Sequence, residues 1–146
     1  MENQLNSEPI NKKIKLDFKD SKYATGRRKK AIAKVWLKKG SGIIHVNGKK
    51  MVDYFKKPNL QISICRPLTL VKRENEFDIR CSVKGGGLSG QAGAIIHGLA
   101  RAIVLFEPDL KLTLKKEKLT TRDSRAVERK KYGHKKARKS FQFSKR

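Results

Sequence analysis

The stretch FDIRCSVKGGGLSGQAGAIIHGLARAIVLF, residues 77–106, decides the fold of this chain. Its first seven residues alternate between apolar and polar side chains, which predicts a β-strand with one buried face. From Ser89 to Phe106 the apolar residues recur at intervals of three and four, which predicts an amphipathic helix. The apolar face expected for that helix consists of Ala92, Ile96, Leu99, Ile103 and Phe106.

Further strands and short helices are predicted around this stretch. Residues 23–38 contain an apolar run ending in β-forming side chains, and we interpret them as one strand that opens with a basic cluster. The shorter elements expected are a turn at 39–42, a strand at 43–46, a tight turn at Asn47-Gly48, a helical piece at 51–55 stopped by Pro58, and a helix at 110–119. Residues 60–65 are ambiguous, and residues 67–71 are either a helix start or an irregular link. Strands interleaved with one strong helix predict a small α+β domain, in which helices cover one face of a sheet.

The glycine-rich loop after the predicted strand matches a dinucleotide-binding pattern, Gly85-x-Gly87-x-x-Gly90. The context argues against this enzymatic interpretation, because the helix leads into Glu-Pro-Asp and another predicted helix, not into a second buried strand. A Walker phosphate loop is excluded because Gln91 and Ala92 stand where Lys and Ser or Thr are required. We expect the glycines to let the chain turn and the helix approach the sheet closely. The loop's backbone N–H groups and the helix N-terminus would then face an RNA phosphate.

The charge of the chain points to a polyanionic partner. The 146 residues carry a net charge of +24, and the segment 129–146 holds nine Lys or Arg and no acid. Without those nine charges residues 1–128 still carry +15, so the body is basic as well. A protein this charged adheres to nucleic acid. A membrane surface is a weaker alternative, because no apolar run approaches the roughly 20 residues that span a bilayer.

The segment 129–146 has too few apolar groups to build a core, so we expect it to be unfolded alone and to become ordered on RNA. Its three aromatic rings, Tyr132, Phe141 and Phe143, lie among cations and can stack on bases or ribose. They favour binding over a merely solvated tail.

A second basic cluster, Arg27-Arg28-Lys29-Lys30, stands within the predicted strand 23–38. Adjacent strand residues point to opposite faces, so about half of these cations can face one groove. The alternative is a solvated edge that its charges protect against aggregation. We favour phosphate binding, because the positive charge of the rest of the chain already predicts a polyanionic partner.

No enzyme, cofactor or metal is expected. The three histidines, His45, His97 and His134, have no ligand-like spacing with Cys65 or Cys81. Both thiols are expected to be reduced, since the chain shows no secretory signal. His97 is interpreted as a surface or RNA contact.

Neither a catalytic triad nor a pair of carboxylates stands out in the sequence, and Trp36 is expected in the core. Residues 1–20 contain four acids and lack Arg, unlike a transit peptide.

Several motifs, in order along the chain, resemble those of bacterial-type small-subunit ribosomal protein nine. They are Tyr23–Val35, Lys84–Ala94, Gly98–Ala102, Thr121–Arg125, Val127–Gly133 and Phe141–Arg146. The resemblance runs from about residue 22 to residue 146, with only a loose match over residues 56–75.

The resemblance implies a fold like the second domain of ribosomal protein five, with a four-stranded sheet. It implies binding to the 3′ major domain of small-subunit rRNA in the head, beside neighbouring head proteins, with no membrane. The tail would thread through RNA to the P site, where Ser144, Lys145 and Arg146 are similar to the part that touches tRNA. The ribosome would be that of a bacterial cytoplasm or an organelle, a mitochondrion or plastid.

The residues expected to bind rRNA are cations of these motifs and of the tail between them. They are Arg27, Arg28, Lys29, Lys30, Lys84, Arg101, Arg122, Arg125, Arg129, Lys130, Lys131, Lys135, Lys136, Arg138 and Lys139. The expected organisation is a polar extension over 1–21, a globular RNA-binding domain over 22–121 and a basic tail over 122–146. The rival functions are a nucleotide-using enzyme and a free nucleic-acid-compacting protein.

Overall fold

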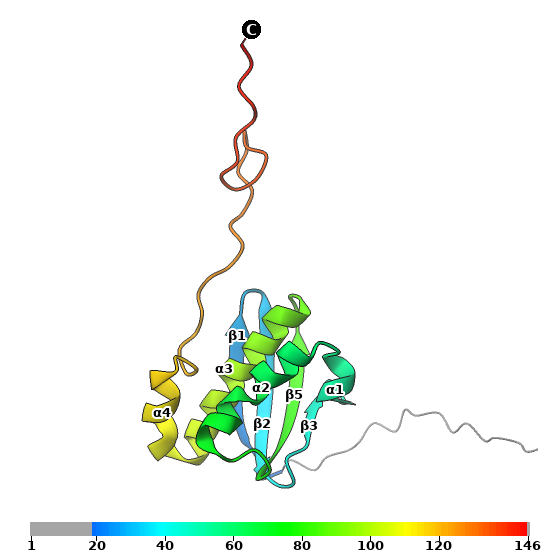
Figure 1. Ribbon diagram of the computed structural model, residues 1–146, viewed down its shortest axis with the longest axis vertical. Helices are drawn as coiled ribbons and strands as arrows, with labels where there is room; N and C mark the ends of the chain where they lie inside the picture. Colours follow the sequence, from blue (N-terminus) through cyan, green and yellow to red (C-terminus); the bar gives the residue numbers. More distant parts are fainter. Residues whose placement is uncertain (1–18, 146) are drawn as a thin grey trace, which may run out of the picture.

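A five-stranded mixed sheet with helices packed on one face forms the body of the molecule (Figure 1). The structure is a computed structural model, and it describes residues 19–145. The elements are β1 (Lys22–Arg28), β2 (Ala31–Lys39), β3 (Ile44–Val46), β4 (Lys49–Lys50), α1 (Met51–Tyr54), α2 (Pro58–Val71), β5 (Phe77–Lys84), α3 (Leu88–Phe106), a 3-10 turn (Pro108–Leu110) and α4 (Lys111–Lys116). The predicted α+β class is confirmed.

The strand order is β1-β2-β5-β3-β4. β5 runs antiparallel to β2 and parallel to β3, so the long segment between β3 and β5 crosses over and carries α1 and α2. The two-residue β4 adds a fifth strand to the four that were expected. Within residues 19–145 no helix covers the other side of the sheet, which we call the uncovered face (Figure 1).

The strand and helix of residues 77–106 are confirmed. The inward side chains of β5 are at most 4% exposed, and those between them are exposed or half-buried. The face predicted for α3 needs one correction, because Ile95 is fully buried whereas Ile96 is half-buried. Since α3 packs against both the sheet and α2, its buried arc is wider than one stripe and is centred nearer Ile95 and Leu99.

The interpretation of residues 23–38 as one strand is wrong. They form an antiparallel hairpin in which Gly26 pairs with Ala33, and the turn falls at Lys29-Lys30. Lys29 adopts φ 51°, a left-handed conformation usually taken by Gly, Asn or Asp, so its sequence carries no turn signal. The tight turn at Asn47-Gly48 is confirmed, with positive φ at both residues.

The undecided region 60–71 is helical. Pro58 begins α2, where its fixed φ suits the first turn and its missing N–H costs nothing. Pro67 lies inside the same helix and is buried. The short α1 therefore ends at Tyr54, before Pro58, and a second helix follows almost at once.

The expectation that Trp36 belongs to the core is wrong. Val35 and Leu37 are fully buried, and alternation turns Trp36 to the uncovered face, where it is half-buried. The two thiols are free, as expected. Burial raises the pKa of the Cys81 thiol to about 12, so it stays protonated. The expectation that no apolar run approaches the length of a membrane span is wrong, because α3 has that length and hydropathy. Most of α3 is buried inside the domain, as in the core helix of a soluble fold.

Candidate nucleic-acid interface

The β1–β2 turn and the β5–α3 loop meet at one end of the sheet, which we call the basic end. A Cβ added to Gly85 would lie 2.7 Å from the carbonyl oxygen of Lys30, so the two turns are in contact. The cations gathered at this end are Arg27, Arg28, Lys29, Lys30 and Lys84. The chain from α4 passes the same end of the body before it becomes the tail (Figure 1). Residues that are far apart in the sequence thus build one positively charged surface.

The glycine-rich loop lets the chain turn from β5 into α3. Gly85 and Gly86 have φ of 73° and 63°, a backbone region that other residues rarely adopt. The side-chain Nε2 atom of Gln91, in the first turn of α3, donates a hydrogen bond of 3.2 Å to the carbonyl of Gly85 and holds the loop closed. After α3 the described chain continues into a 3-10 turn and α4, so no second parallel strand follows, as expected for a loop that is not a dinucleotide site.

Arg28 is drawn inward, away from the other cations of the basic end. Its side chain lies against Gly93 of α3, where a Cβ would overlap the Arg28 Cδ atom. Its Nη2 atom lies 3.5 Å from Asp123 Oδ2, and its Nε atom is buried without a hydrogen-bond partner. Of the four consecutive cations, Arg28 therefore contacts α3 and the start of the tail, and connects both to β1.

Asp123 connects the start of the tail to the body, because its carboxylate contacts both Arg28 and Arg125. Arg125 donates to it through Nη2 at 2.9 Å, Nε at 3.0 Å and its backbone N–H at 3.1 Å. These hydrogen bonds and the nearby guanidinium of Arg28 hold the pKa of the Asp123 carboxyl far below its usual range. Arg28 and Arg125, both expected to bind rRNA, thus share one carboxylate that ties the start of the tail to the body.

His97 and Arg101 fasten α3 to β1. The backbone N–H of Arg27 donates to His97 Nδ1 at 3.2 Å, and Arg101 Nη1 donates to the carbonyl of Thr25 at 2.7 Å. Burial, and then the charge of Arg101, lower the pKa of His97, so its ring is neutral near pH 7. His97 is consequently a structural acceptor within the fold, and Arg101 donates one of its N–H groups internally.

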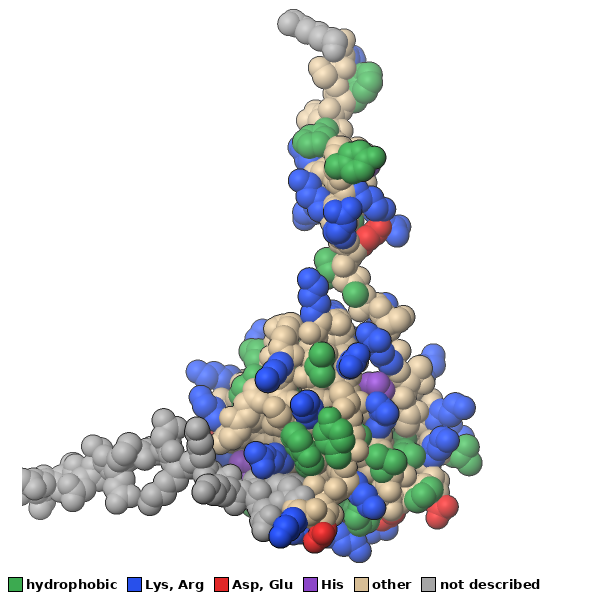
Figure 2. Space-filling model, turned by 180° about the vertical axis from the view of Figure 1, so that it is seen from behind, with side chains coloured by type: hydrophobic (Ala, Val, Ile, Leu, Met, Phe, Trp, Pro, Cys, Tyr) green, Lys and Arg blue, Asp and Glu red, His purple; other side chains and the backbone are tan. Residues whose placement is uncertain are grey.

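Beyond residue 125 the tail leaves the body and offers its side chains to solvent (Figures 1 and 2). Tyr132 is 95% exposed and Phe143 88%. Glu128 accepts from Lys131 and Arg138, each at 2.9 Å, and these hydrogen bonds lower the pKa of its carboxyl.

The remaining tail cations are free of ion pairs with the described residues: Arg129, Lys130, Lys135, Lys136 and Lys139. Lys135 instead places Nζ 5.7 Å from the centre of the Phe141 ring. Ser144 and Lys145 are exposed at the far end, and Arg146 lies outside the described residues.

The family model of ribosomal protein S9/S16 matches this chain over residues 26–146. The chain belongs to the ribosomal protein S9/S16 family. It is therefore a structural constituent of the small ribosomal subunit, a ribonucleoprotein that serves translation.

Every cation expected to contact rRNA falls within the range matched to the S9/S16 family. The structure brings Arg27, Lys29, Lys30 and Lys84 together at the basic end. It does not bring the tail cations to the same place, since the tail extends away from the body (Figure 1). Arg122 lies between these two groups and close enough to His97 to act on its charge.

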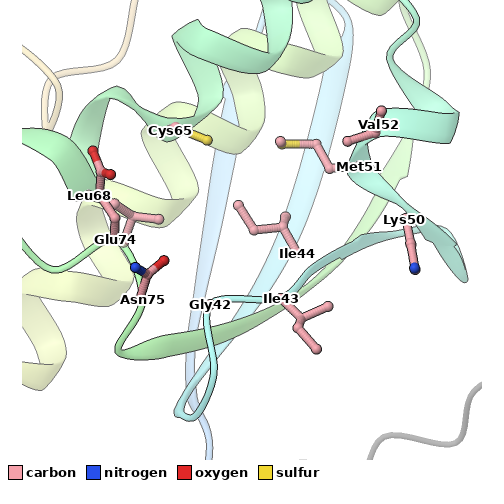
Figure 3. Close-up of a pocket in the computed structure, with 10 residues that line it drawn as sticks. All are labelled: Gly42, Ile43, Ile44, Lys50, Met51, Val52, Cys65, Leu68, Glu74 and Asn75. Carbon is pink, nitrogen blue, oxygen red and sulfur yellow. The ribbon is translucent and has the colours of Figure 1, made fainter.

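The S9/S16 domain also has an apolar hollow of about 420 Å³ between β3, α1 and α2 (Figure 3). Met51 of α1 and Cys65 of α2 point toward each other across it, and Ile44 of β3 points into it between them (Figure 3). Burial, and then the charge of Glu74, raise the pKa of the Cys65 thiol, so the hollow offers no activated nucleophile. Within residues 19–145, no group of three His, Cys, Asp or Glu side chains is placed to hold a metal ion.

Among the features that sequence reasoning missed are the side chains on the uncovered face of the sheet. The Tyr23 and Trp36 rings lie 5.3 Å apart there, centre to centre. The signal was present in the alternation of β2, because Trp36 stands between the two buried residues Val35 and Leu37.

Proposed function

We propose that this S9/S16 family chain binds small-subunit rRNA in the head through its basic end and its tail. We further propose that the tip of the tail contacts the P-site tRNA. The observation that carries this proposal is the tail itself. Its cations Arg129, Lys130, Lys135, Lys136 and Lys139 form no ion pair with the described residues, and its aromatic rings face solvent. Cations neutralise backbone phosphates, and exposed rings stack on unpaired bases.

The basic end supplies the second contact. Lys29, Lys30 and Lys84 form no ion pair within residues 19–145, so their charge is available to a partner. The glycine loop and the start of α3 lie beside them, and backbone N–H groups at a helix N-terminus favour an anion. The junction at Asp123 starts the tail beside this end of the body, so one RNA could run from the basic end along the tail.

Binding to an RNA transcript of the 3′ major domain, measured over a range of salt concentrations, tests the proposal. In the tail variant, Arg129, Lys130, Lys136 and Lys139 are replaced by Gln. In the matched control the same number of cations is removed from α4 and the end of α2, at Lys72, Lys111, Lys115 and Lys116.

We expect the tail variant to bind more weakly and to lower the slope of log K against log salt by about 0.7–0.9 for each phosphate that is no longer neutralised. The control should retain most of the wild-type slope. Equal slopes for the two variants would show that the tail contributes only its share of the net charge, and the proposal would be rejected.

A further inference from the structure

A row of side chains crosses the uncovered face of the sheet in register. Tyr23 of β1 stands opposite Trp36 of β2, and Trp36 stands opposite Arg80 of β5. Arg80 is in turn paired with His45 of β3, which is buried, so the exposed part of the row consists of the first three side chains. Neighbouring strands thus place two aromatic rings and a guanidinium side by side on the uncovered face of the sheet.

The members of this row hold one another in place. The Tyr23 and Trp36 rings are tilted by 43°, and Arg80 Cζ lies 5.8 Å from the centre of the Trp36 ring. The Tyr23 hydroxyl is hydrogen-bonded to Thr25 Oγ1 at 2.9 Å. Tyr23 is nevertheless 44% exposed, and Arg80 is exposed. The rings are therefore fixed before any partner arrives, which reduces the entropy lost on binding.

The charge that the strands place around the row is positive. Lys34 and Lys38 extend from β2 on the same face. Asp78 is the one acid in β1, β2, β3 and β5, and its Oδ1 atom accepts from the N–H groups of Ser41 at 2.8 Å and Ile43 at 3.1 Å. Figure 2 shows hydrophobic side chains in the middle of this face with Lys and Arg around them. Exposed aromatic groups ringed by cations suit a base and its phosphates, whereas a protein partner would need acids of its own to match the charge.

We propose that Tyr23, Trp36 and Arg80 form a stacking platform that binds one unpaired nucleotide of the RNA. The base stacks on the aromatic pair, and Arg80 and Lys34 meet the adjacent phosphates. Every base has a flat face that can stack. The platform therefore selects an unpaired nucleotide but discriminates little between the four bases. This inference rests on the proposed binding of rRNA and adds a third contact, separate from the tail and the basic end.

The first measurement uses the intrinsic fluorescence of the full-length chain, because Trp36 is its only tryptophan. A 3′ major domain transcript should quench Trp36 on binding, since a base stacked on the indole quenches its excited state by charge transfer. Polyphosphate binds the same cations but has no base, and it should leave most of the emission intact. Acrylamide, a neutral quencher, should reach Trp36 in the free chain and be excluded in the complex.

The second measurement separates stacking from charge. Trp36→Leu and Tyr23→Leu should each weaken RNA binding on the order of tenfold at moderate salt and leave the salt slope unchanged. Trp36→Phe and Tyr23→Phe keep a ring and should restore most of the affinity. Lys34→Gln should lower the slope instead. Ile62→Ala removes an exposed apolar side chain from α2, on the helical side, and serves as the matched control.

Equal quenching by polyphosphate and by RNA would overturn the platform, as would Trp36→Leu binding as well as Ile62→Ala. The platform is also overturned if acrylamide cannot reach Trp36 in the free chain, because another part of the chain would already cover the face. If wild-type and variants alike fail to bind the transcript, the proposed function fails instead. Tyr23 lies on the edge strand β1, so Tyr23→Leu remains informative even if the change at Trp36 prevents folding.

Discussion

Gly26 in β1 and Gly98 in α3 bring the backbones of a strand and a helix into direct contact. A Cβ added to Gly26 would overlap the Gly98 nitrogen and the Ala94 carbonyl oxygen, while one added to Gly98 would lie 2.8 Å from a Val35 methyl group. The atoms that a Cβ on Gly26 would meet belong to the backbone of α3, so they cannot rotate away as a side chain could. This contact holds α3 close enough to β1 for the Arg27–His97 and Arg101–Thr25 hydrogen bonds to form.

Gly26→Ala should therefore destabilise the domain by about 3 kcal/mol, because the helix must move off the sheet. Gly87→Ala is the matched control, since a Cβ there meets nothing within 4 Å and its φ is −101°. That change should cost less than about 1 kcal/mol. Urea unfolding measures the loss of stability in both variants. Equal losses would show that the close approach of α3 is not the reason why position 26 requires glycine.

Two adjacent residues of α3 test the depth of its packing. Ile95 is fully buried and Ile96 is half-buried. Ile95→Ala should lower the free energy of unfolding by about 2–5 kcal/mol, because it leaves a cavity in the core. Ile96→Ala should cost about half as much or less. The check is the urea midpoint at constant slope, and a larger cost at Ile96 would contradict the deeper burial of Ile95.

The free energy of unfolding should fall on acidification through His97. Burial lowers its pKa in the folded chain below the ordinary 6.5, so the unfolded chain binds a proton that the folded chain does not. The stabilising contribution is complete above about pH 6.5, declines as the pH falls from there towards the folded-state pKa, and then levels off.

His97→Gln should remove this component of the pH dependence, whereas His134→Gln, in the tail, should follow the wild-type curve. The measurement is the free energy of unfolding from about pH 8 to about pH 5. Parallel curves for wild type and His97→Gln would rule out His97 as the source.

The cations of the basic end should divide into two kinds. Replacing Arg27 and Lys29 by Gln should weaken RNA binding and change stability by less than about 0.5 kcal/mol, because both side chains are exposed. Arg28→Gln should reduce stability as well, since it loses its packing on Gly93 and its ion pair with Asp123. Thermal unfolding beside RNA titration distinguishes the two, and equal loss of stability in both variants would contradict this division.

Removing residues 144–146 should spare assembly and weaken tRNA binding. The rest of the tail keeps seven cations, so incorporation into the subunit should be nearly normal. P-site tRNA should lose about 1–2 kcal/mol, the value of a few charge-assisted hydrogen bonds, and to a similar extent for different tRNAs. The measurement is tRNA affinity for subunits that carry the shortened chain. Unchanged affinity with normal incorporation would exclude the tip as a tRNA contact, and failed incorporation would make it an rRNA anchor.

The sequence predicts those helices and strands whose secondary structure and buried face follow from one local pattern of residues. The alternation of β5 and the spacing of α3 identify both, because each buries a face that is visible within its own residues. The β1–β2 turn escapes prediction because Lys29 takes a conformation for which lysine has no preference. α2 escapes because Pro58 begins the helix and Pro67 is tolerated within it.

The candidate site divides in the same way. Charge density alone marks the tail and the basic cluster, since both are runs along the chain. The inward turn of Arg28 depends on Gly93 and Asp123, which are distant in sequence, and only the fold brings them together. The row Tyr23–Trp36–Arg80 likewise requires the strand order, because β5 reaches the side of β2 only after the crossover through α1 and α2.

The extended tail has a consequence for the lifetime of the chain in a cell. Proteases that cleave after Lys or Arg need an exposed, extended substrate, and residues 129–145 offer such bonds outside any helix or strand. A copy that is still unassembled can thus be shortened without being unfolded. If the tail binds RNA as proposed, assembly protects it, and an intact C-terminal segment marks a chain that was assembled promptly.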